Sequence, residues 1–210
     1  MIHSDISSGS YKNNKKMNKT NKGFTLMELL IVIGVLGILA AGLLAAIDPF
    51  EQLKKARDTN NRSAAIEMLG SSQRYYATHG YLPWYKMTGA VYDCTSATID
   101  TLRVSATDYP FSAVLVNKEG SPGHDAGMKT CIDNTLGVDG EIKDTFFDGL
   151  STTLYVTSGS KTRVGVCFPP ESKSNRSDAQ TIYNIATAGV VTAGCTVDQR
   201  DAGQCVQCFQ

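Results

Sequence analysis

The chain has 210 residues, of which 42% are hydrophobic and 19% charged, which suits a single packed domain with an appendage. The formal net charge is zero, but residues 1–23 hold five lysines and one aspartate, leaving 15 basic and 19 acidic residues elsewhere. This acidic remainder argues against a dedicated nucleic-acid-binding protein, because such proteins carry a basic footprint.

An uncharged apolar run extends from Leu29 to Ile47, and residues 24–27 lengthen it at the front. A membrane-spanning helix needs roughly 20 apolar residues, so the run is long enough. Five lysines and no acidic residue lie within residues 12–22, whereas the other flank mixes both signs. The positive-inside rule therefore predicts residues 1–23 in the cytoplasm and the bulk of the chain outside.

Two alternatives compete with a membrane span. A buried helix of a soluble protein is disfavoured because such helices seldom stay apolar on all faces over this length. A cleaved secretory signal is disfavoured because the run exceeds the usual h-region and contains Glu28, although the AAGLLAA stretch offers small residues for cleavage.

Glu28 places one carboxylate almost at the start of the apolar run. A charge inside a bilayer costs free energy and usually pairs with another group, although near the boundary its side chain can reach the interface. Glu28 is thus either an interfacial residue without a role or, as we favour, an acid that awaits a positively charged partner.

The stretch Gly23-Phe24-Thr25-Leu26-Met27-Glu28, followed by an unbroken apolar helix, resembles the N-terminus of type IV pilins and pseudopilins. The resemblance implies that a membrane-embedded prepilin peptidase cuts between Gly23 and Phe24 and methylates the new amine of Phe24. Glu28 would become the fifth residue of the mature chain, as in the family. The likeness covers residues 17 to about 83, and the rest only in layout. Either Met1 or Met17 serves as the start of the leader.

The charges expected at Phe24 and Glu28 after cleavage support a role in assembly for the N-terminal segment. Cleavage creates an α-ammonium on Phe24, and such groups have a pKa of about 7.7–8.0 in model peptides. The Glu28 of one subunit could pair with the Phe24 amine of its neighbour inside an apolar bundle. Removing one partner of a buried pair typically costs about 3–5 kcal/mol, and a lone buried polar group can set register.

Residues 48–79 are predicted to form an amphipathic continuation of the helix. At Asp48-Pro49 the helix either kinks at Pro49, which the resemblance favours, or restarts with Asp48 as its N-cap. Gly80 and Pro83 predict the end of the helix. The apolar stripe is thin between residues 57 and 63, which suggests exposure there or packing by other subunits.

Residues 80–210 are predicted to form an extracytoplasmic β-rich head, giving an α+β, pilin-like fold of a long N-terminal helix packed on a small antiparallel sheet with disulfides. Strand-like runs occur at 111–117, 154–158, 163–168 and near 188–194, with a tight hairpin at 158–161. Residues 96–109 suit a short helix or a strand, and 120–127 and 169–178 are predicted loops. Trp84 and Tyr85 are expected in the core.

All six cysteines follow the apolar run, and an even number beyond a membrane anchor favours disulfides in an oxidising compartment. The CxxC at 205–208 ends two residues before the last residue given, which suits neither a redox motif nor zinc. Its two cysteines are expected to pair with different partners. The sequence leaves the connectivity open among the disulfide candidates Cys94, Cys131, Cys167, Cys195, Cys205 and Cys208.

No catalytic or cofactor motif emerges: GxSxG, HExxH and P-loop patterns are all missing from the sequence. We predict no enzymatic activity, no cofactor and no metal site. An acidic segment at residues 133–148 leaves calcium open, since hard cations prefer carboxylate oxygens, but its spacing matches no EF-hand. Nucleic acid is not an expected partner, and a DNA-uptake role would need a basic patch, for which the candidates are Lys161, Arg163, Lys173 and Arg176.

The predicted organisation is a cytoplasmic leader at 1–23 that is removed, a transmembrane and assembly helix at 24–47, the amphipathic helix at 48–79 and the head at 80–210. The predicted function is a structural subunit of a type IV pilus-like filament, with adhesion, motility or DNA uptake as possible roles. Its expected partners are copies of itself, other pilins, prepilin peptidase, the membrane platform of the assembly machinery and, before assembly, the lipid bilayer. The expected location is the cytoplasmic membrane and then a periplasmic or extracellular filament. The alternatives are a type II secretion pseudopilin and a single-pass anchored binding or enzymatic domain.

Overall fold

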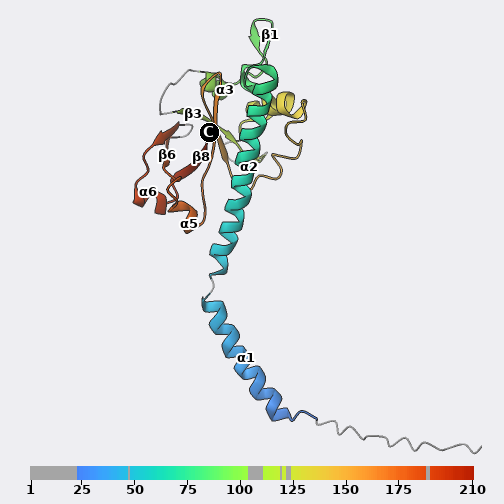
Figure 1. Ribbon diagram of the computed structural model, residues 1–210, viewed down its shortest axis with the longest axis vertical. Coiled ribbons are helices and arrows are strands. Elements are labelled where there is room, and N and C mark those ends of the chain that lie inside the picture. The colour runs from blue at the N-terminus through green and yellow to red at the C-terminus, as the bar shows by residue number, and fades with distance from the viewer. Residues whose placement is uncertain (1–22, 47, 104–110, 119, 122–123, 188–189) are drawn as a thin grey trace, which may run out of the picture. The chain divides into compact units, whose positions relative to one another are not determined.

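The computed structural model describes residues 23–46, 48–103, 111–118, 120–121, 124–187 and 190–210 (Figure 1). The chain divides into two units, residues 1–47 and residues 48–210. In the first unit, helix α1 runs from Leu26 to Ala46. It is the one helix in the described part of the chain that is long and apolar enough to cross a membrane, over Leu26–Leu44. The predicted span at 24–47 therefore corresponds to a helix, and Ile47 lies outside the described residues.

Helix α2 occupies Pro49–His79 and opens the second unit. The carboxylate of Asp48 accepts hydrogen bonds from the amides of Phe50 and Glu51, and Pro49 is the first helical residue. The structure therefore has the second of the two expected arrangements, in which a new helix starts at Pro49 with Asp48 as its N-cap. The favoured prediction, a kink at Pro49 within one continuous helix, is wrong. The restart suits proline, which lacks an N–H that a first-turn position would leave unpaired anyway.

The end of α2 is confirmed where the sequence predicts it. Gly80 adopts a left-handed conformation with φ of 79°, and its N–H donates to the carbonyl of Tyr76 at 2.7 Å. Glycine adopts this conformation without the steric cost that a Cβ would bring.

The head combines short helices with a closed, antiparallel sheet whose described strands follow the order β3-β4-β5-β8-β6-β7. These strands are β3 (Phe111–Val116), β4 (Leu154–Ser160), β5 (Arg163–Phe168), β6 (Tyr183–Thr187), β7 (Val190–Ala193) and β8 (Cys205–Phe209). A separate hairpin pairs β1 (Met87–Thr88) with β2 (Val91–Tyr92). The short helices are η1 (Pro83–Tyr85), α3 (Ala97–Arg103), α4 (Ala126–Ile132), the π-helical η2 (Asp133–Gly137), α5 (Lys173–Arg176) and α6 (Val197–Asp201).

This arrangement confirms the α+β class and the four predicted strand regions, and it adds β6 and β8. The predicted hairpin exists between β4 and β5, but Ser160 pairs with Arg163, so the turn is at residues 161–162. The predicted loop at 169–178 contains helix α5. Residues 97–103 are helical, and residues 104–110 of that ambiguous stretch lie outside the described residues.

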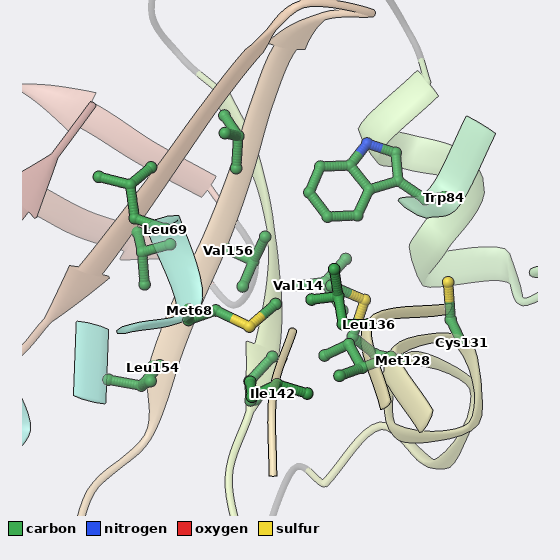
Figure 2. Close-up of a cluster of buried hydrophobic side chains, with 14 of the residues drawn as sticks. Met68, Leu69, Trp84, Val114, Met128, Cys131, Leu136, Ile142, Leu154 and Val156 are labelled. Atoms are coloured by element: carbon green, nitrogen blue, oxygen red, sulfur yellow. The ribbon is translucent and has the colours of Figure 1, made fainter. Parts of the chain in front are cut away.

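The core lies between α2, the sheet and the α4–η2 segment. Figure 2 shows Met68 and Leu69 of α2 grouped with strand residues Val114, Leu154 and Val156. Trp84 is fully buried in the same cluster and Tyr85 is 7% exposed, which confirms their predicted core positions.

Most of residues 57–63 of α2 are exposed, as expected for this thin part of the apolar stripe, but two polar residues there pack against the head. Asp58 and Asn61 are 1% and 2% exposed. The Asp58 carboxylate accepts hydrogen bonds from the amides of Glu171 and Ser172, the Ser172 hydroxyl and the side-chain amide of Asn175. These polar residues can be buried because the head supplies donors for them: the loop before α5 for Asp58 and the Ser151 hydroxyl for Oδ1 of Asn61.

Candidate processing and assembly site

The segment expected to be processed starts at Gly23, directly before α1. Phe24 is 81% exposed. A methyl group added at Gly23 would meet nothing within 4 Å. Packing among the residues that the structure describes therefore does not require glycine there, and we expect any requirement to come from a partner that approaches the backbone.

Thr25 and Glu28 form a reciprocal pair of contacts at the start of α1. The backbone N–H and the hydroxyl of Thr25 each donate to Oε2 of Glu28 at 2.9 Å. The Glu28 amide donates to the Thr25 hydroxyl at 3.2 Å. This is a capping box, in which the N-cap and the third helical residue satisfy each other's free amides. Glu28 therefore has a local structural use in the single chain besides the assembly role predicted for it.

Sequence reasoning missed the role of Thr25 as the N-cap of α1. The signal is present, because Thr25-Leu26-Met27-Glu28 is a Thr-x-x-Glu pattern directly before an apolar run. The family resemblance emphasises Glu28 as a charge, whereas its place in the helix cap follows from this local pattern.

Beyond Glu28, α1 presents large apolar side chains on all sides. None of the residues in the Leu26–Leu44 window is buried within the chain. The exposed fractions of Leu29, Leu36 and Leu43 are 58%, 57% and 66%. An exposed surface of this size is stable only against lipid or against other apolar helices.

The cysteines form three disulfides, namely Cys94–Cys131, Cys167–Cys208 and Cys195–Cys205. The two cysteines of the CxxC pair with different partners, as predicted. Cys208 lies directly opposite Cys167 in the register of β5 and β8, so this bridge links paired strands. Two of the three bridges thus hold the C-terminal strand β8, which lies between β5 and β6.

The acidic segment is divided among ion pairs. Asp133 contacts Lys129 at 2.5 Å, Asp139 contacts His79 at 3.4 Å and Glu141 contacts Arg74 at 2.5 Å. Within the described part of the chain, no three His, Cys, Asp or Glu side chains are grouped as a metal site. Two of these pairs fasten the segment to the C-terminal half of α2.

The basic residues considered for DNA contact do not form one patch. Arg163, from the β4–β5 hairpin, lines a cavity with Gln73 and Tyr76 of α2. Lys173 of α5 donates its amide to Glu51, which lies 22 residues earlier than Gln73 on the same helix, or about 33 Å at 1.5 Å per residue. Lys161 accompanies Arg163, and Arg176 accompanies Lys173, so the candidates form two separated pairs.

Comparison with known families agrees with this N-terminal geometry. Residues 18–44 match the prokaryotic N-terminal methylation motif, the prepilin-type signal of type IV pilins and pseudopilins. The match includes Gly23, Phe24, Thr25 and Glu28 and ends where the membrane-length helix window ends. No curated protein and no solved structure matches the chain significantly.

Proposed function

We propose that this chain, which carries the prepilin-type signal, is a non-enzymatic structural subunit of a type IV pilus-like filament. The observation that supports the proposal is the motif at residues 18–44 together with a glutamate at the third position of an apolar, fully uncovered helix. The precursor is inserted with its leader in the cytoplasm, and prepilin peptidase cuts between Gly23 and Phe24. The mature subunit then leaves the membrane for the filament.

Assembly follows from the exposed helix and from charge. In a bundle of α1 helices, the apolar side chains that lipid covers before assembly would contact one another. The Phe24 amine of one subunit would face the Glu28 carboxylate of the next, and this pairing would select the stagger between them. A staggered, head-to-tail contact does not close on itself, so repetition generates a fibre and not a ring.

The same signal serves pseudopilins, so a short pseudopilus of a type II secretion system is the second candidate within this class. The two candidates share every step up to polymerisation. They differ in where the filament ends, which electron microscopy of intact cells and of the periplasmic fraction would distinguish.

The deciding measurement is the intact mass and N-terminal sequence of the chain purified from membranes. We expect a chain that begins at N-methylated Phe24. A Gly23→Val variant provides a matched control: it should retain residues 1–23 and still fold, because a Cβ at Gly23 meets none of the described residues within 4 Å. If the wild-type chain also retains residues 1–23 in cells that contain the peptidase, it is a simple membrane-anchored domain.

A further inference from the structure

The first two turns of α2 carry an uncovered extension of the stripe that binds the head. Phe50 and Met68 are 18 residues apart, which is five turns of an α-helix, so they lie on the same face. Met68 is fully buried, whereas Phe50 is 73% exposed and Leu53 is 59% exposed. The head therefore covers this face only from about Asp58 onward, and the apolar stripe continues without cover toward the N-terminus of α2.

Two basic residues of α2 share the face of this uncovered pair, because Lys54 is four residues after Phe50 and Arg57 is four residues after Leu53. The Arg57 side chain is 53% exposed and contacts the Glu171 carboxylate of the head at 3.4 Å. The loop of the head that reaches these turns adds Lys173, whose amide donates to Glu51 at 3.0 Å. We name this surface the lower patch, and it consists of Phe50, Leu53, Lys54, Arg57 and Lys173.

The acidic residues of the same turns are bonded within the unit. Asp48 caps α2, and Asp58 accepts its hydrogen bonds from the loop before α5. Glu51 accepts from the Lys173 amide and from the Lys54 ammonium. The outward chemistry of the lower patch is therefore an aromatic and an aliphatic side chain, beside the long side chains of Lys54 and Arg57, whose charges pair with Glu51 and Glu171. Helices with this composition bind the boundary between lipid headgroups and acyl chains, where lysine and arginine extend their charges to water.

Chain length limits where the lower patch can be. Phe50 follows Leu44, the last residue of the membrane-length window, by six residues. Six fully extended residues span at most about 20 Å, so the chain keeps Phe50 close to the headgroup layer whenever α1 is inserted. We propose that the lower patch is a phospholipid contact that holds the head of the unassembled subunit against the outer face of the bilayer. This inference rests on the membrane stage of the proposed function.

The contact between the lower patch and lipid is tested by depth-dependent fluorescence quenching. The full chain is placed in lipid nanodiscs, with one chain in each disc. The natural Trp84 is fully buried in the head and provides a constant background. A Phe50→Trp variant adds a second tryptophan in the lower patch. A Val138→Trp variant is the control, because Val138 is 76% exposed and belongs to the segment fastened to α2 near Arg74 and His79, at the opposite end of that helix.

We expect lipids brominated near the top of the acyl chain to cause a roughly twofold or larger loss of the emission added in Phe50→Trp. The emission added in Val138→Trp should be lost hardly at all. Combining Leu53→Asp with Phe50→Trp should abolish most of the quenching, because the apolar pair is broken. Leu53 is 59% exposed, so this change leaves the core intact.

The outcomes separate this inference from the proposed function. If the chain enters the discs and the added emission of Phe50→Trp is quenched no more than that of Val138→Trp, the lipid contact is wrong, while the membrane stage of the proposed function stands. If the chain does not enter the discs at all, both are wrong. If Phe50→Trp is unquenched in single-chain discs but its emission shifts to the blue when chains associate, the lower patch binds a second copy, and the lipid contact is overturned.

Discussion

The carboxylate of Asp58 accepts both the backbone amide of Ser172, at 2.9 Å, and the hydroxyl of the same residue, at 2.6 Å. The two residues are 114 positions apart, and both are buried. Asp58 thereby acts as an anchor on α2 for the loop that leads from β5 to α5.

Asp58→Ala should destabilise the head by about 2–4 kcal/mol. The reason is that the buried amide and hydroxyl of Ser172 and the partly buried donors of residues 171 and 175 lose their acceptor. Urea unfolding in detergent, followed by the emission of Trp84, would measure the change. The exposed Asp148 provides the control, and Asp148→Ala should alter stability by less than about 0.5 kcal/mol. Equal effects of the two substitutions would show that the anchor has no energetic importance.

The C-terminal end of α2 allows a graded test of backbone conformation at Gly80. Its φ of 79° disfavours a Cβ, but asparagine tolerates this region better than alanine. We expect Gly80→Ala to cost about 1 kcal/mol and Gly80→Asn to cost less. Thermal unfolding of the two variants beside the wild type gives the order, and a more stable alanine variant would contradict the cap.

The three disulfides should differ in energetic importance according to the loops they close. Cys167–Cys208 spans 41 residues and Cys195–Cys205 spans 10. In the chain-entropy account, these loops correspond to about 4 and about 3 kcal/mol. The double variant Cys167→Ala/Cys208→Ala should therefore unfold at lower urea than Cys195→Ala/Cys205→Ala. The opposite order would mean that chain entropy is not the dominant effect.

Acid should weaken the contact between α2 and α5. The amide of Lys173 and the ammonium of Lys54 hold the pKa of Glu51 below its usual value of 4.5. The stabilisation is therefore fully present above the unfolded pKa and is lost as the pH falls through the lower folded value. After correction for intrinsic rates, hydrogen exchange at the Lys173 amide should accelerate in that range. In Glu51→Gln this acid-dependent acceleration should disappear, and an unchanged profile would exclude Glu51 as its source.

The sequence predicts the local features of this fold well. The Gly80 end of α2 depends on the dihedral preference of that residue, and the capped start at Asp48-Pro49 was one of two arrangements that the local residues allowed, although the family resemblance favoured the other. The β4–β5 hairpin depends on two strand-like runs separated by a short polar stretch. In each case the physical cause lies within a few residues of the feature.

Features that depend on distant contacts were not predictable in this way. The strand Cys205–Phe209 was not predicted from the sequence, because it forms where β5 and β6 offer hydrogen-bonding edges to either side of it. The burial of Asp58 and Asn61 similarly depends on donors from residues 151 and 171–175. A polar residue on a helix is predicted as exposed unless its remote partner is known.

The contacts between Thr25 and Glu28 give the assembly hypothesis a test that separates charge from helix capping. Glu28→Gln keeps a capping acceptor at the third helical position but removes the negative charge, whereas Thr25→Ala removes the cap and keeps the charge. If the charge pairs with the Phe24 amine of a neighbour, Glu28→Gln should enter the membrane and be cleaved but yield few or no fibres. Thr25→Ala should polymerise at close to the wild-type yield, since losing a cap costs only about 1 kcal/mol. Fibres sheared from cells, with N-terminal mass spectrometry of the membrane fraction, provide both readouts. Full assembly of Glu28→Gln together with failure of Thr25→Ala would assign the importance of Glu28 to the helix start and not to its charge.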